Sequence, residues 1–155
     1  MQIAVCEDVA LSAEDLFDAM ARFPLIEEVW PRPGVTVERL DEPTRTGPGM
    51  KWRLRVVYRD RLYETEIRLT RFERAVLMEF DGAAAGLGAR TRVDLVPFSP
   101  SMTRLALTIE TRAGNLAGRA LLQGLRLRRG RIEARLAGLL AEYARRLERG
   151  IGPGA

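Results

Sequence analysis

Side chains that could take part in acid–base chemistry are few in this sequence. It contains no histidine, and Lys51 is its only lysine, so nearly all of its positive charge is arginine. Histidine is the commonest general base and zinc ligand, and arginine keeps its proton at working pH. Such chemistry would therefore fall to carboxylates, tyrosines or the single cysteine. The sequence contains no phosphate-binding loop, metal-ligand cluster or nucleophilic triad, so we expect neither a metal nor a cofactor.

Glu7 is the carboxylate that is placed best for such a role. Residues 2–9 alternate between apolar and polar side chains, which predicts a strand with Glu7 on its apolar side. A carboxyl group in that position could serve as an acid or base. Alternatively, a bulge or the strand end turns it to water. Cys6 faces the other way beside acidic neighbours, and we do not expect it to be a nucleophile.

Three hydroxyl groups gather in the middle of the chain. Tyr58, Tyr63 and Thr65 fall on the apolar side of two predicted strands. A tight turn between these strands places Arg55 opposite Glu66, and Tyr58 opposite the second tyrosine, so that apolar and charged faces both match. In an apolar cavity such hydroxyls could orient a polar ligand group. Alternatively, they bond to each other, to the backbone or to water.

A sheet must position these residues. After the first strand, Ser12 and Asp15 form a capping-box-like pattern that starts a helix, and two prolines bracket a second short helix at residues 25–29. Alternation then predicts six further strands, an arrangement typical of an antiparallel sheet with one wet face. Three of these strands are predicted at residues 35–40, 50–58 and 63–69. The other three are marked by the inward positions Val76, Met78 and Phe80, by Thr91, Val93 and Leu95, and by Leu105, Leu107 and Ile109. Residues 41–49 and 82–89, rich in glycine or proline, are predicted loops.

One long helix closes the domain. From about residue 115 to residue 149, apolar side chains recur every three or four positions. This stripe consists of Leu122, Leu125, Ile132, Leu136, Leu139, Tyr143 and Leu147. Four glycines interrupt the helix, and we expect its first half to kink or fray. Residues 1–150 form one predicted domain, and residues 151–155 a disordered tail.

Arg129 lies within this stripe. Its guanidinium could meet a ligand carboxylate or phosphate. Alternatively, Gly130 marks a kink and Arg129 reaches solvent. Residues 119–135 contain six arginines and a single acidic residue, Glu133. They could touch anionic lipid headgroups, although a solvated helix face explains them as well. The stretch lacks base-stacking aromatic residues, so we expect no nucleic-acid partner.

The length, composition and net charge are those of an ordinary globular protein. It has 155 residues, 46% hydrophobic and 30% charged, with a net charge of +4. No stretch approaches the length of apolar residues that a membrane span needs, and the N-terminus lacks the basic start of a signal peptide. One cysteine permits no internal disulfide. We expect a cytoplasmic protein, either a monomer or a homodimer.

Three segments carry a resemblance to a known family. Residues 9–17 (VALSAEDLF) are similar to its strand-to-helix turn, residues 47–52 (GPGMKW) to its glycine-led third strand, and the closing leucine/arginine helix to its C-terminal helix. With the order of elements over residues 2–148, they resemble the helix-grip fold of the START-related SRPBCC superfamily. That superfamily includes polyketide cyclase/dehydrase and lipid-transport proteins. The resemblance implies an α+β fold, in which a curved antiparallel sheet of about seven strands wraps around a long C-terminal helix, with two short helices after the first strand.

This architecture predicts a cavity between the sheet and the closing helix. We expect it to bind or transport a small hydrophobic ligand, such as a lipid, polyketide or aromatic compound, with residues 41–49 and 82–89 gating the entrance. The expected lining is Trp52, Leu54, Tyr58, Tyr63, Thr65, Ile67, Met78 and Phe80 from the sheet, and Leu122, Leu125, Arg129, Ile132 and Leu136 from the helix. The same residues could instead fill a solid core. Two other functions stay open: a cyclase or dehydratase in the same cavity, and a membrane-surface or protein-interaction module that uses the basic helix.

Overall fold

A computed structural model describes residues 1–22, 34–41, 47–58 and 60–150, apart from the side chain of Tyr58. The short helix predicted at residues 25–29, most of the predicted loop at residues 41–49, and the tail at residues 151–155 lie outside these residues.

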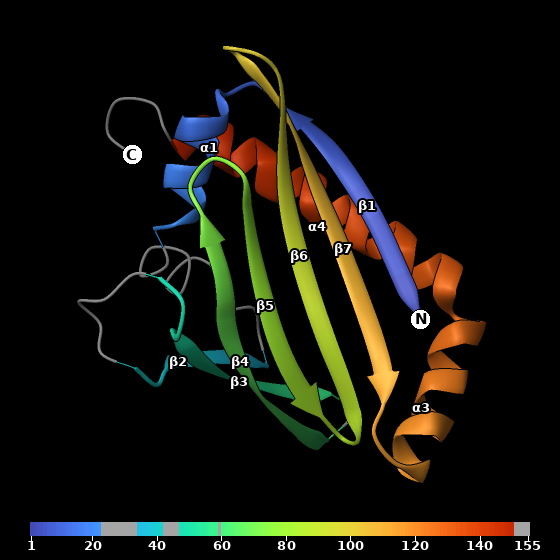
Figure 1. Cartoon of the computed structure of the whole chain (residues 1–155). Helices are drawn as coiled ribbons and strands as arrows, with labels where there is room; N and C mark the ends of the chain where they lie inside the picture. Colours follow the sequence, from blue (N-terminus) through green and yellow to red (C-terminus); the bar gives the residue numbers. More distant parts are fainter. Residues whose placement is uncertain (23–33, 42–46, 59, 151–155) are drawn as a thin grey trace.

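The alternating segments form one antiparallel sheet. Its strands are β1 (Gln2–Val9), β2 (Val35–Arg39), β3 (Lys51–Tyr58), β4 (Arg61–Glu73), β5 (Leu77–Ala84), β6 (Leu87–Ser99) and β7 (Met102–Ala113). Their order in the sheet is β1-β7-β6-β5-β4-β3-β2, with seven strands and antiparallel neighbours throughout. Strands β2 and β3 run across the direction of β6 and β7, so the sheet is strongly curved (Figure 1). The predicted seven-stranded sheet is confirmed.

The helices cover one face of this sheet, which we call the inner face. Helix α1 (Ala13–Met20) follows β1, and the predicted cap holds because the Ser12 Oγ accepts a hydrogen bond from the Asp15 backbone N–H, at 3.1 Å. The long closing helix is two helices, α3 (Leu116–Leu127) and α4 (Arg129–Gly150), separated at Arg128. The predicted kink is therefore confirmed beside Gly130. Helix α4 runs along β1 and β7, and α3 lies at the end of the sheet where β1 begins (Figure 1).

The register of β3 and β4 differs from the prediction. Arg55 lies opposite Glu64 rather than Glu66, and Tyr63 lies opposite Val56. A shift of two residues keeps every side chain on its predicted face, because the side-chain period of a strand is two. The charged faces still match, since Arg53 forms an ion pair with Glu64 at 2.8 Å. The residue pattern therefore could not distinguish the two registers.

The loop predicted at residues 82–89 is instead a hairpin. Gly82 pairs with Ala89, and Ala84 pairs with Leu87. The turn consists of Ala85 and Gly86, both with positive φ (52° and 80°), as tight two-residue hairpin turns require. These residues therefore do not form the flexible loop that was expected to gate the cavity entrance, because their backbones are hydrogen-bonded within the sheet.

This hairpin turn holds the start of α3. Asn115 caps the helix, and its Oδ1 accepts a hydrogen bond from the Gly118 N–H at 2.8 Å. The Gly86 carbonyl accepts a hydrogen bond from the Gly114 N–H, also at 2.8 Å. A Cβ on Gly118 would collide with the Gly86 carbonyl oxygen. Glycine at residue 118 therefore lets a helix backbone lie directly on a turn backbone.

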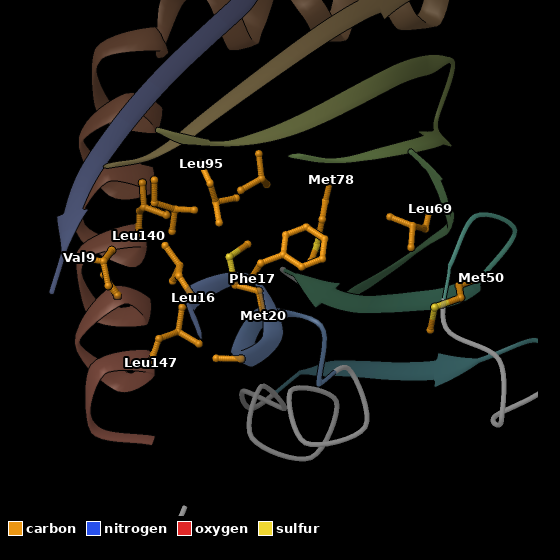
Figure 2. Close-up of a cluster of buried hydrophobic side chains, with 14 of the residues drawn as sticks. Val9, Leu16, Phe17, Met20, Met50, Leu69, Met78, Leu95, Leu140 and Leu147 are labelled. Atoms are coloured by element: carbon orange, nitrogen blue, oxygen red, sulfur yellow. The ribbon is translucent and has the colours of Figure 1, made fainter. Parts of the chain in front are cut away.

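The core fills the half of the inner face nearest to α1, which we call the closed half. Its side chains come from the strands, α1 and the second part of α4 (Figure 2). The phenyl rings of Phe17 and Phe72 are 4.9 Å apart at their centroids. Helix α4 contributes Leu140, Ala144 and Leu147, so its buried side is turned slightly from the predicted stripe. The closed half includes Val9, Leu16, Phe17, Trp52, Leu69, Met78, Leu95, Leu105, Leu140, Ala144 and Leu147.

Candidate ligand-binding site

The inner face changes character along the strands. Near α1 its side chains are large and buried, whereas toward the β5–β6 turn they are smaller and partly exposed. Cross-strand pairing places Ile3, Ile109, Thr91 and Phe80 in one row. We call the part-exposed region the open half. It consists of Thr65, Ile67, Phe80, Gly82, Ala84, Ala89, Thr91, Leu107, Ile109 and Thr111.

The start of α4 lies level with this open half. Arg145 bonds to Glu7 and Asp8, which fixes the position of α4 along β1. Leu136 precedes Arg145 by nine helical steps, a rise of about 13.5 Å, and four steps along β1 cover about the same length. Leu136 is therefore level with Ile3. Leu136, Ile132 and Leu125 are partly buried, as is Glu133 of α4.

The predicted lining residues fall into three groups. Trp52, Met78 and Leu122 are at most 8% exposed, so they pack as core residues. Arg129 is exposed at the first position of α4, just after the break. The side chain of Tyr58 lies outside the described residues. The remaining predicted residues are partly exposed on the inner face or on the helix side that faces it: Leu54, Tyr63, Thr65, Ile67, Phe80, Leu125, Ile132 and Leu136.

Two of the three hydroxyl groups predicted from the sequence can be followed on this surface, Thr65 in the open half and Tyr63 at its edge. The Thr65 hydroxyl donates to the Ala83 carbonyl at 2.9 Å, so a backbone group already satisfies it. Tyr63 is 41% exposed, and its hydroxyl makes no hydrogen bond with any described residue. Tyr63 thus offers a hydroxyl to a polar group at the edge of the open half, and Thr91, within it, likewise makes no side-chain hydrogen bond with a described residue.

Solved structures share this arrangement. The Zhui aromatase/cyclase from Streptomyces sp. R1128 has a TM-score of 0.68 and 18% identity, over 94% of both chains. The protein TTHA0849 from Thermus thermophilus has a TM-score of 0.69 and 13% identity, over 97% of both chains. Norcoclaurine synthase from Thalictrum flavum, in complex with dopamine and hydroxybenzaldehyde, has a TM-score of 0.64 and 15% identity, over 88% of this chain and 83% of that one.

This chain has the helix-grip fold. The fold that the sequence resemblance implied is therefore confirmed. No protein-family model matches the chain, and no curated protein matches it. At sequence identities of 13% to 18%, these neighbours show that the fold is shared, but they do not show that the activity of any one of them is shared.

Glu7 of this helix-grip domain lies away from the open half. Alternation continues through Val9, so Glu7 does face inward, and the alternative of a bulge is wrong. Its partner across the sheet is Leu105, a residue of the closed half. Its carboxylate forms an ion pair with Arg145 at 3.0 Å. Glu7 therefore anchors α4 to β1, and we assign it that structural task.

Other titratable groups do not supply a base either. Tyr143 packs against the core, and burial raises the pKa of its hydroxyl far above the ordinary value, so it stays protonated at physiological pH. Cys6 is exposed on the outer side of β1, as expected. The described residues contain no group of three or more side chains suited to hold a metal ion.

A hollow of about 260 Å³ lies on the outer face of the sheet. Charged side chains surround it, including Asp81, Arg90, Glu110 and Arg112. Arg90 is already engaged by Asp81 at 3.0 Å and by Glu79 at 3.1 Å. An apolar ligand would have to displace water from these charges, which is unfavourable. We therefore favour the inner face over this hollow.

Several residues of the open half were absent from the predicted lining. They are small or sit on β5, β6 and β7: Gly82, Ala84, Ala89, Thr91, Leu107, Ile109 and Thr111. The available signal was a run of small residues at alternate positions on neighbouring strands. Small side chains facing inward leave room beneath a helix, whereas large side chains would fill that room.

Proposed function

We propose that this protein binds a small hydrophobic molecule on the open half of its inner face, beneath Leu125, Ile132 and Leu136. The supporting observation is the change from large buried side chains to small, part-exposed ones along the same face. When a ligand covers apolar surface between the two layers, removing that surface from water contributes about 25 cal/mol per Å² to the binding free energy. A flat, wholly exposed face would not give a ligand comparable coverage.

The helix-grip neighbours support an aromatic or polyketide-like ligand. One of them is an aromatase/cyclase, and another is a synthase in complex with dopamine and hydroxybenzaldehyde. In this chain the Phe80 ring packs on Trp52, at 6.1 Å between ring centroids, and is partly exposed on the open half, where a planar ligand could contact it; Tyr63 offers a hydroxyl at the edge. A ring system with one polar group matches this pair of contacts better than a fully apolar chain.

A matched pair of substitutions tests the proposal. Thr91 lies on the inner face in the open half, whereas Thr108 lies on the outer face of the neighbouring strand. Thr91→Phe adds a ring inside the open half, and Thr108→Phe adds the same ring outside. We expect Thr91→Phe to weaken binding of the fluorescent probe 8-anilinonaphthalene-1-sulfonate at least ten-fold, and Thr108→Phe to change it less than about two-fold.

The readouts are probe titration and native mass spectrometry with a panel of aromatic phenols and fatty acids. Thermal unfolding of both variants shows that the fold is retained. Equal probe affinity in the two variants would place the ligand elsewhere and overturn the proposal. So would the absence of any saturable binding by the unmodified protein.

An enzymatic role in the same place has one residue in its favour. Tyr63 is a titratable side chain at the edge of this surface, and its hydroxyl makes no hydrogen bond with a described residue. A cyclase or dehydratase would use that hydroxyl to position or protonate an enolate oxygen. Tyr63→Phe should then abolish turnover of a polyketide-like substrate while it leaves probe binding within about two-fold. Unchanged turnover in this variant would remove Tyr63 from the mechanism.

A further inference from the structure

The outward side of α3 is apolar throughout. At 100° per residue, the core-facing side of this helix contains Gly118, Leu122 and Leu125. The opposite side, about 140° wide, carries no charged residue. It consists of Leu116, Ala117, Ala120, Leu121, Gly124 and Leu127, all exposed. Leu116 is 79% exposed and Leu127 is 90% exposed, so this short helix shows apolar side chains to both the core and the solvent.

Positive charge borders this apolar side along one flank of α3 and beyond its C-terminal end. Residues 114–135 contain six arginines and one glutamate, a net charge of +5, whereas the whole chain has +4. None of these arginines (Arg119, Arg126, Arg128, Arg129, Arg131 and Arg135) forms an ion pair with a described residue. Nine arginines elsewhere in the described sequence do form such pairs. Six arginines without an ion pair among the described residues therefore follow one another within residues 119–135, a segment whose single acidic residue is Glu133.

We propose that α3 docks on an anionic lipid bilayer, with Leu116, Leu121 and Leu127 entering the headgroup region and the arginines contacting lipid phosphates. A helix lies in a membrane interface when it combines an uncharged apolar side with flanking basic residues. The long arginine side chains extend toward the phosphates while their stems remain beside apolar groups. The opposite side of α3 stays on the protein, because Gly118 and Leu122 are buried there.

The charge argues against a second copy of this chain as the occupant. A symmetric dimer through α3 would bring two regions of net charge +5 together. Like charges at an interface oppose association unless counter-charges intervene. Glu133 alone does not balance them. An anionic bilayer supplies both the counter-charge and the apolar layer.

Docking through α3 would also place the open half close to the membrane. Leu125 belongs to the same helix and faces inward, next to the partly buried Ile132. A hydrophobic molecule could then pass between bilayer and protein over a short path. This consequence rests on the proposed function, but the docking itself does not, and the two are tested separately.

The test is co-flotation with vesicles of phosphatidylcholine containing about one third phosphatidylglycerol. We expect saturable binding by the full chain at low salt, weakened at least ten-fold as salt rises from about 50 to about 500 mM. The Leu116→Glu/Leu127→Glu variant should bind at least about fifty-fold more weakly. Arg119→Gln and Arg126→Gln should each weaken binding about five-fold. The control Leu62→Glu, at a 61% exposed leucine of β4, should bind as the unmodified chain does.

Probe binding and circular dichroism show whether each variant stays folded, and the exposed positions chosen leave the core intact. Absence of binding to these vesicles at low salt would overturn the proposal. Loss of binding in Leu62→Glu equal to that in Leu116→Glu/Leu127→Glu would overturn it too. If light scattering instead shows a dimer that Leu116→Glu/Leu127→Glu dissociates, α3 is a self-association surface and the membrane assignment is wrong. If the unmodified protein binds the vesicles but does not bind the fluorescent probe, the result counts against the proposed function and not against membrane docking.

Discussion

Asp41 links the end of β2 to the start of β3. Its carboxylate accepts a hydrogen bond from the Arg39 Nε at 2.9 Å and another from the Lys51 backbone N–H at 3.2 Å. The hydrogen bond from Arg39 lowers the pKa of Asp41 most, and the Lys51 N–H lowers it further, against a smaller opposing effect of burial. A carboxyl group with a lowered pKa stabilises the fold above its unfolded pKa, and this contribution is lost as the pH falls through the folded pKa.

Asp41→Asn should therefore reduce stability near neutral pH by about 1 kcal/mol. The difference from the unmodified chain should shrink below about pH 4, where the native carboxyl group also becomes protonated. Urea unfolding at a series of pH values measures both effects. Asp60→Asn, in the exposed β3–β4 turn, is the matched control. Its free energy of unfolding should equal that of the unmodified chain at each pH. A constant difference down to about pH 2 would show that the carboxylate charge is not responsible.

Among the elements, α3 depends on a backbone contact more than on its leucines. Gly118 packs against the carbonyl of Gly86, and Asn115 caps the helix beside it. The two glycines come from segments that the sequence separates by a whole hairpin, and only their small size permits the approach. In contrast, Gly124 and Gly138 have open space where a Cβ would lie.

Gly118→Ala should destabilise the protein by about 2–3 kcal/mol, because the new methyl group collides with backbone that cannot move cheaply. Gly138→Ala, in α4, should instead raise stability by up to about 1 kcal/mol through helix propensity. Chemical unfolding of the two variants gives the comparison, and amide hydrogen exchange along α3 locates the damage. If Gly118→Ala behaved like Gly138→Ala, the close approach of α3 to the hairpin turn would be incorrect.

At the scale of the whole molecule, the inner face divides into a closed half and an open half. Leu105 and Leu107 are the same residue type on the same side of β7, yet Leu105 is fully buried and Leu107 is partly exposed. Leu105 lies under α1 and the end of α4. Leu107 lies toward the part-exposed row that includes Thr91. The division follows from α1 covering only one end of the curved sheet (Figures 1 and 2).

Leu105→Ala should cost about 3–4 kcal/mol, because it opens a void among well-packed neighbours. Leu107→Ala should cost about 1–2 kcal/mol, since its side chain is already partly hydrated. Thermal and urea unfolding give both values. A ligand that covers the open half should stabilise the unmodified protein and lose most of this effect in Leu107→Ala. Equal costs for the two substitutions would contradict the division into halves.

Alternation and capping determined much of this fold in advance. The period of two assigned the side chains of the strands to their correct faces even where the β3–β4 register was misjudged, because a shift of two residues leaves the faces unchanged. Ser12 started α1 as expected. The glycines in the closing helix anticipated the break at Arg128. These features depend on neighbours within a few residues, so local sequence contains them.

The division between packed and open surface was decided by the tertiary structure. Trp52 and Thr65 lie on the same side of neighbouring strands and look equivalent in an alternating pattern, yet one is core and the other is part-exposed. The difference depends on which helix lies above each residue, and hence on how the chain returns over the sheet. The close approach of Gly118 in α3 to the Gly86 turn was likewise decided by the tertiary structure. Such contacts join residues far apart in the chain, and burial is a property of that whole arrangement rather than of any segment.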